Sequence, residues 1–294
     1  MSWTPTGPSG GSIELWGGGT TRPRAFFVYW SIMKTDNPPR ISIIVPVYHE
    51  AERIAALLDC LEDLDPRRIS ERVVVEGAPE GDTLRAIEDR DIVAVRSSRG
   101  RARQMNAGAK AASGDILLFL HADTTLPPGT LDAVEDAFAD DDVVGGAFCI
   151  RFDSKRLMLK LFGRIDSWRA RITRVPYGDQ AIFVRRDYFN MIGRYSDIPL
   201  MEDIELMKRI KRRGNRIRIL QMSVTSSSRR WEREGHIFCT ARNCMLVVLY
   251  SLGVSPRFLK RFYPDNPVIR GPFKTRPERD GCRAGERKRT GDDV

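Results

Sequence analysis

Residues 40–47 have the sequence RISIIVPV, a nearly continuous run of β-branched side chains. A strand that is buried on both faces needs such a run, because both of its sides contact apolar neighbours. Between residues 50 and 64, apolar side chains then recur at the spacing of a helix packed on one face. The two segments together predict a βα unit.

The same alternation continues as far as residue 123. It predicts strands at residues 71–76, 92–95 and 115–120 and helices at residues 83–89 and 101–112. Alternating strands and helices indicate a parallel, doubly wound α/β sheet rather than a β-sandwich.

The second half of the chain is expected to add to the same sheet. The strand expected at residues 143–152 contains Gly145 and Gly146, where a backbone or a ligand can approach closely. Further strands are expected at residues 181–185 and 216–220, and helices at 156–174, 202–213 and from 231 to about 252.

The composition allows one large domain, because 41% of the 294 residues are hydrophobic. We expect a disordered or over-extended start at residues 1–37, a catalytic domain at 38–230, a helical extension at 231–268 and a disordered basic tail at 269–294. The net charge of +9 is partly carried by the two ends. A solvated surface, a groove for phosphates or contact with anionic lipid accounts for it, and no nucleic-acid partner is predicted.

The five cysteines are odd in number and form no CxxC pair, which fits a reducing cytoplasm. No apolar run approaches the roughly 20 residues that a membrane-spanning helix needs. The apolar stretch at residues 243–263 also carries basic side chains. It predicts a helix packed on the core or, as the less favoured alternative, peripheral contact with the inner face of a membrane beside a lipid-linked acceptor.

Polar side chains follow the predicted parallel strands, where ligands of such sheets bind. Tyr48 and Glu50 follow the first strand, Glu76 ends the second, and His121 and Asp123 follow the fourth. A GxGxxG motif is absent from the first turn, which counts against a dinucleotide-dependent dehydrogenase.

His121 and Asp123 are two positions apart in the segment LLFLHADT, residues 117–124. Side chains at this spacing point to one side of an extended chain, so both can face one cation or one diphosphate. The alternative is that Asp123 caps the following turn while His121 packs beside it.

Four segments together resemble the family 2 inverting glycosyltransferases of the GT-A fold. They are IIVPVYHEAERI, VVVEGAPEGDT, GRARQMNAGAKAASGDILLFLHADTTLPPG and MEDIELMKRIKRRG, in this order between about Arg40 and Arg218. The resemblance is closest to a bacterial subgroup with HAD at residues 121–123. It implies a mostly parallel sheet flanked by helices, a C-terminal helical extension, and metal-dependent transfer of a sugar from a nucleoside-diphosphate sugar to an acceptor hydroxyl.

The resemblance also implies roles for single residues. Asp123, with His121, would bind Mn2+ or Mg2+ as the last acid of a DxD motif. Glu202 and Asp203 match a catalytic ED motif in which Asp203 is the general base, although an acidic helix start explains the pair equally well. The nucleoside and diphosphate would be held by Pro46, Tyr48, Glu50, Glu76, Arg103 and Gln104.

Three departures from the family pattern weaken parts of this prediction. His121 stands in place of the first aspartate, and imidazole suits manganese at least as well as magnesium. Glu76 stands where the family usually has aspartate, and His236 is only a weak candidate for the family's late metal-binding histidine.

Residues 176–180, PYGDQ, are expected to shape the acceptor pocket. Tyr177 could stack on a sugar ring while Asp179 and Gln180 bond its hydroxyls. The alternative is a type II turn in which Gly178 has a positive φ.

Two other functions stay open. A nucleotidyltransferase would use a similar sheet, but it should carry a glycine-rich basic loop where this chain has PVYHEAERI. A catalytically inactive relative that binds a nucleotide-sugar would explain the missing first aspartate.

Overall fold

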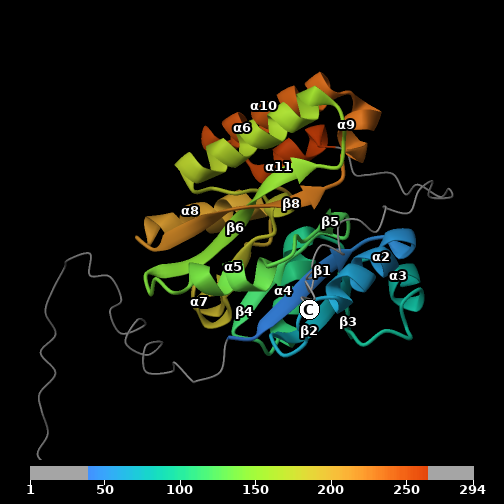
Figure 1. Ribbon diagram of the computed structural model, residues 1–294. Coiled ribbons are helices and arrows are strands. Elements are labelled where there is room, and N and C mark those ends of the chain that lie inside the picture. Colours follow the sequence, from blue (N-terminus) through green and yellow to red (C-terminus); the bar gives the residue numbers. More distant parts are fainter. Residues whose placement is uncertain (1–38, 264–294) are drawn as a thin grey trace, which may run out of the picture.

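The computed structural model describes residues 39–263, so the predicted N-terminal segment 1–37 and tail 269–294 lie outside the described residues. In this part of the chain, the strands form one sheet in the order β3-β2-β1-β4-β7-β6-β8-β5 (Figure 1). The strands are β1 (Ile41–Val47), β2 (Ile69–Glu76), β3 (Val93–Arg96), β4 (Ile116–Phe119), β5 (Thr124–Thr125), β6 (Val143–Phe152), β7 (Phe183–Arg185) and β8 (Arg216–Ser226).

The first half of the sheet is parallel. Strand β1 pairs with β2 on one side and β4 on the other, and β3 adds to the edge of β2. Along β1, Ile43 and Val45 belong to the core on one face and Ile44 to the core on the other. The predicted burial on both faces is therefore confirmed.

The second half of the sheet mixes directions. Strand β7 is antiparallel to both β4 and β6, β5 is antiparallel to β8, and β6 and β8 are parallel. The mostly parallel α/β sheet is as predicted, except for the three antiparallel pairings.

Helices cover both faces of the sheet, as a doubly wound fold requires. One face packs against α2 (Ala51–Glu62), α3 (Asp82–Arg85) and α5 (Thr130–Ala137), and the other against α4 (Arg101–Ala111), α7 (Arg186–Met191) and α8 (Glu202–Arg212). Helix α5 was not predicted from the sequence.

The glycine pair of β6 accommodates neighbouring backbone rather than a ligand. A Cβ atom on Gly146 would lie 2.2 Å from the carbonyl oxygen of Arg218 in β8, and one on Gly145 would lie 2.6 Å from the carbonyl oxygen of Phe183 in β7. The close approach of the three strands therefore depends on these glycines.

A further layer lies above β6 and β8 (Figure 1). It contains α6 (Leu157–Thr173), α9 (Arg229–Glu234), α10 (His236–Ser251), α11 (Pro256–Leu259) and η2 (Lys260–Phe262), while η1 (Gly178–Gln180) precedes β7. The helix expected from residue 231 is broken at Gly235, where φ is 87°. The extension packs on α8 through Ile204, Leu246 and Leu259. Within residues 39–263, no helix is long and apolar enough to cross a membrane.

Candidate functional site

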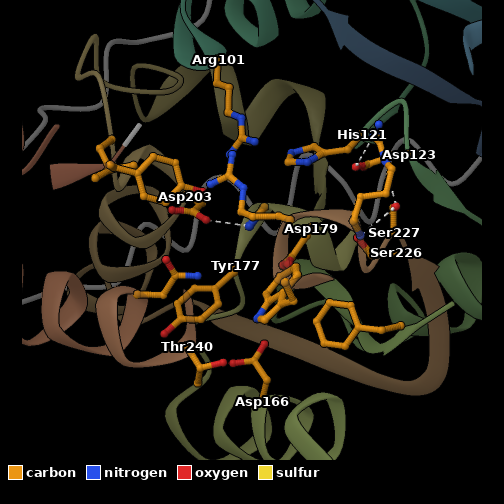
Figure 2. A pocket seen from close by; sticks show the side chains of 18 of the residues that line it. Arg101, His121, Asp123, Asp166, Tyr177, Asp179, Asp203, Ser226, Ser227 and Thr240 are labelled. Atoms are coloured by element: carbon orange, nitrogen blue, oxygen red, sulfur yellow. Dashed lines mark hydrogen bonds and ion pairs between the residues drawn. The ribbon is translucent and has the colours of Figure 1, made fainter. Parts of the chain in front are cut away.

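A cavity of about 550 Å3 lies between the carboxyl ends of β1 and β4 and the helices α6 and α10, which contribute Asp166 and Thr240 to its lining (Figure 2). Its volume falls in the range of roughly 300–1,000 Å3 that is usual for sites binding small ligands. Its polar lining includes Tyr48, Glu50, Arg101, His121, Asp123, Asp166, Tyr177, Asp179, Glu202, Asp203, Arg229 and Arg230.

Asp123 is held at the wall of this cavity by the pairing of β5 with β8. Its carbonyl oxygen accepts a hydrogen bond of 3.2 Å from the N–H of Ser227, and its carboxylate lies 3.5 Å from Nη2 of Arg229. The Asp123 carboxylate therefore faces the guanidinium of Arg229 in the cavity. Among the described residues, it makes no capping hydrogen bond to the backbone.

His121 approaches the same cavity from the turn after β4 (Figure 2). Burial lowers the pKa of His121 to about 3, and the positive charges of Arg101 and Arg230 act in the same direction. The imidazole is therefore neutral at physiological pH, with a nitrogen lone pair available as a donor.

Glu202 and Asp203 begin α8 on the opposite side of the cavity. Oδ2 of Asp203 accepts a hydrogen bond of 2.6 Å from the N–H of Gly178, and Oδ1 accepts one of 2.7 Å from the N–H of Ile204. A Cβ atom on Gly178 would lie 3.3 Å from Nε2 of His121. Gly178 therefore permits close contact between the two sides of the site.

The alternative of a type II turn at Gly178 is wrong. Gly178 is not among the glycines with positive φ, and it begins the short helix η1 instead. Gln180 of this segment is fully buried and donates to the carbonyl oxygen of Phe148, so it does not face a ligand.

Three acidic side chains of the cavity resist ionisation. Burial raises the pKa of Asp179 to about 7, helped by the charges of Asp166 and Asp203. Burial and the charge of Asp203 raise the pKa of Glu202 to about 7, and burial also raises the pKa of Asp203. Raised carboxyl pKa values in a cleft are typical of groups that exchange protons or bind hydroxyls.

Arg101 enters the cavity from the first turn of α4 (Figure 2). Its burial lowers its pKa, but Tyr263, Glu202 and Asp203 outweigh this effect and raise it. Arg103, which the resemblance favoured, does not line the cavity, and its Nε lies 2.8 Å from Oδ1 of Asp197. Positions two apart on a helix point to opposite sides, so only one of these arginines can face the site.

The residues expected to hold a nucleoside divide into two groups. Tyr48 and Glu50 line the cavity, whereas Pro46, Glu76 and Gln104 do not. Glu50 forms an ion pair of 2.6 Å with Nη1 of Arg53.

Glu76 and Gln104 shape the strand ends from within the protein. The two oxygens of Glu76 accept 3.0 Å hydrogen bonds from the N–H groups of Ala78 and Thr83. The amide of Gln104 donates to the carbonyl oxygens of Val47 and Val75 at 2.7 and 2.9 Å. Gln104 therefore joins the ends of β1 and β2, and Glu76 fixes the loop that follows β2.

The remaining wall comes from segments that carried no recognisable motif. Helix α9 contributes Arg229 and Arg230, and α6 contributes Asp166 and Arg169, whose guanidinium lies 3.6 Å from the ring centroid of Tyr177. His236 lies outside the cavity, with its Nε2 2.8 Å from Nη1 of Arg156.

The donor set suits a divalent cation only in part. Within residues 39–263, no group of three or more histidine, cysteine or acidic side chains is arranged to hold a metal ion alone. Asp123 and neutral His121 are two acceptable donors on one wall. A cation held by two protein donors takes its other ligands from substrate phosphates and water, as Mg2+ usually does.

Comparison with known proteins identifies the family. Residues 42–199 match the family model described as Glycosyl transferase family 2. The chain belongs to glycosyl transferase family 2. The match includes His121 and Asp123 but ends before Glu202 and Asp203.

Individual family members are distant. The probable glycosyltransferase YdaM of Bacillus subtilis (strain 168) is 23% identical over 222 residues, which are 67% of this chain and 51% of that protein. The chain thus spans about half the length of this curated relative.

A solved structure shows the same fold. The crystal structure of S. aureus TarS superimposes with a TM-score of 0.50 at 16% identity, covering 76% of this chain and 42% of TarS. The mannosyltransferase PcManGT from Pyrobaculum calidifontis, in complex with GDP-Man and Mn2+, gives 0.49 at 22% identity over 70% of this chain and 64% of that one.

Proposed function

We propose that this chain transfers a hexose from a nucleoside-diphosphate sugar to an acceptor hydroxyl with inversion at the anomeric carbon. Membership of glycosyl transferase family 2 supports a transferase of this class. The observation that carries the proposal is one cavity in which Asp123 and His121 face Asp203, with Arg101 between them (Figure 2). A nucleotidyltransferase and an inactive binding relative are the competing functions.

The diphosphate of the donor would lie between Arg101 and the Asp123 wall. Arg101 is a fixed cation whose planar guanidinium suits phosphate oxygens, and Tyr48 and Glu50 lie where the nucleoside would extend toward β1. Asp123 and His121 would hold Mn2+ or Mg2+, which when bound neutralises charge on the departing diphosphate.

Asp203 would act as the general base on the acceptor. Its carboxylate removes the proton of the acceptor hydroxyl as the hydroxyl oxygen attacks the anomeric carbon, and the bond from that carbon to the diphosphate oxygen breaks on the opposite side. Because this is a single displacement, the configuration inverts. Asp179, with its pKa near 7, would bond another hydroxyl of the acceptor.

The cytoplasmic location and the lipid-linked acceptor expected from the sequence stay predictions.

Donor binding can be tested by a thermal-shift screen of UDP-, GDP- and dTDP-sugars with and without Mn2+. A ligand that binds only the folded state raises stability with the logarithm of its saturation. We expect one donor to raise the Tm, more strongly with Mn2+, and we expect Asp123→Asn to remove the Mn2+ increment. A failure of all donors, or an increment that Asp123→Asn leaves unchanged, would contradict the proposed site.

A further inference from the structure

Helix α6 buries its small side chains together with Leu159, and it exposes most of its large apolar side chains. Gly163, Ser167 and Ala170 face the sheet, and the hydroxyl of Ser167 accepts a 3.0 Å hydrogen bond from the N–H of Ile150 in β6. A helix on the surface of a globular protein normally has the reverse arrangement. The exposed stripe, spaced by three and four residues, is Leu157, Leu161, Ile165, Trp168 and Ile172.

Helix α10 and the residue after it repeat this arrangement. Cys239, Arg242 and Leu246 are buried against the rest of the protein. The exposed large apolar side chains are Ile237, Phe238, Met245, Val248 and Leu252. Together with the α6 stripe, these residues form what we call the two-helix apolar face.

The two helices are held at both ends in one layer (Figure 1). Near their starts, Nη1 of Arg156 lies 2.8 Å from Nε2 of His236. Near their ends, Lys211 of α8 donates to the carbonyl oxygen of Thr173 and Lys208 of α8 to the hydroxyl of Ser251. Both helices also line the cavity described above, and Ile165 belongs to both the cavity and the exposed stripe.

Positive charge accompanies the two-helix apolar face. Lys160, Arg164 and Arg171 are exposed and lie in a row along one flank of the α6 stripe. The one acidic residue of α6, Asp166, lines the cavity instead. Residues 236–263 contain no aspartate or glutamate.

We infer that the two-helix apolar face docks on a bilayer surface that carries anionic lipid headgroups, with the cavity opening toward those headgroups. Apolar stripes flanked by lysine and arginine, with a tryptophan in the stripe, are suited to the interface of anionic membranes. A second copy of the chain would place the same cations opposite one another without acidic partners, which opposes self-association. Docking itself does not depend on the proposed transfer reaction. The use of a lipid-borne acceptor would depend on that reaction.

The test is flotation of the purified full-length chain with vesicles. We expect binding to vesicles of phosphatidylcholine mixed with phosphatidylglycerol, and much weaker binding to phosphatidylcholine alone. Leu161→Gln combined with Trp168→Gln should weaken binding about tenfold or more, because both side chains would enter the interface. The matched control is Met191→Gln combined with Val93→Thr, which changes exposed apolar residues away from this face and should not weaken binding.

The charged flank is tested separately. Replacing Lys160, Arg164 and Arg171 singly by Gln should weaken binding to the anionic vesicles about fivefold per charge. The effect of each replacement should be smaller at high salt, which screens the charges. The control replaces Arg67, Arg85 and Lys110, which are exposed cations elsewhere on the protein. All of these variants keep residues 264–294, so the basic tail cannot cause a difference between them.

Three results would overturn the inference. The wild-type chain could fail to float with anionic vesicles, or the apolar and control variants could bind equally. Alternatively, the wild type could dimerise without lipid and lose its dimer in the Leu161→Gln, Trp168→Gln variant, which would assign the face to a second copy. Donor binding in solution is measured without vesicles, so a failure of docking and a failure of the proposed function remain distinguishable.

Discussion

Asp203 and Asp179 lie in one cavity but are held in different ways. Both oxygens of Asp203 accept backbone N–H groups, which fixes the direction of its carboxylate. Oδ1 of Asp179 is buried and has no hydrogen-bond partner among the described residues. An oriented carboxylate suits proton abstraction, and a buried oxygen without a partner suits a ligand hydroxyl. This difference supports Asp203 as the base and Asp179 as a binding group.

Arg101 and Arg103 provide a matched pair of substitutions on one helix. Arg101→Gln should weaken binding of the nucleoside diphosphate by about 10- to 100-fold, because it removes a charge-assisted hydrogen-bond donor from the cavity. Arg103→Gln should leave the Kd within about twofold, because that side chain pairs with Asp197 on the surface. Titration calorimetry measures both, and the reverse order would contradict the placement of the diphosphate.

The pKa of Asp179 predicts how stability depends on pH. Because burial raises the pKa of Asp179 to about 7 from a usual 3.8, the folded state retains a proton that the unfolded state has lost between these values. The free energy of unfolding should therefore fall as pH rises from 4 to 7 and then level off.

Asp179→Asn should make this fall in the free energy of unfolding smaller by about 2 kcal/mol. This is roughly half of the value expected for a fully buried carboxyl group, because solvent screens the partly exposed Asp179. Urea unfolding at several pH values measures it. Asp197→Asn is the control, since Arg103 holds the pKa of that exposed carboxyl below its usual value. An equal fall in the Asp179→Asn and wild-type proteins would show that Asp179 is not the group responsible.

At the scale of elements, two residues with a left-handed backbone conformation turn the chain toward the site. His49 has φ of 54° between β1 and α2, and Met201 has φ of 67° directly before α8. Non-glycine residues rarely adopt such angles, and they are found disproportionately at functional sites. Both residues line the cavity, so the turns that they make help to aim Glu50 and Glu202.

The elements that could be predicted are those whose pattern is local. The buried strands β1 and β4 and the helix α8 follow from hydrophobic spacing and from the residues that end them. Helix α5 has eight residues and only three well-spaced apolar side chains. A helix of this length is too short to show a clear helical periodicity in its sequence. The sequence predicted a helix at residues 156–174, but it could not show that the small residues of α6 face the sheet.

At the scale of the whole molecule, the cavity joins residues from both halves of the chain. Strand ends supplied Tyr48, Glu50, His121 and Asp123, which sheet topology alone brings together. The pairing of β5 with β8 then carries α9 to Asp123, and packing on α8 places α10 above the cavity. No local pattern encodes these long-range contacts, so the arginines of α9 could not be predicted.

We have proposed that this cavity performs glycosyl transfer with Asp203 as the base. The most direct measurement is the rate of nucleoside diphosphate release from the donor that stabilises the protein most, with Mn2+ present and an acceptor hydroxyl supplied. Asp203→Asn should lower kcat by about 10²- to 10⁴-fold while the Kd of the nucleoside diphosphate changes by less than about twofold, and Asp197→Asn should behave as wild type. Release by Asp203→Asn at the wild-type rate, or loss of binding together with turnover, would show that Asp203 is not the general base.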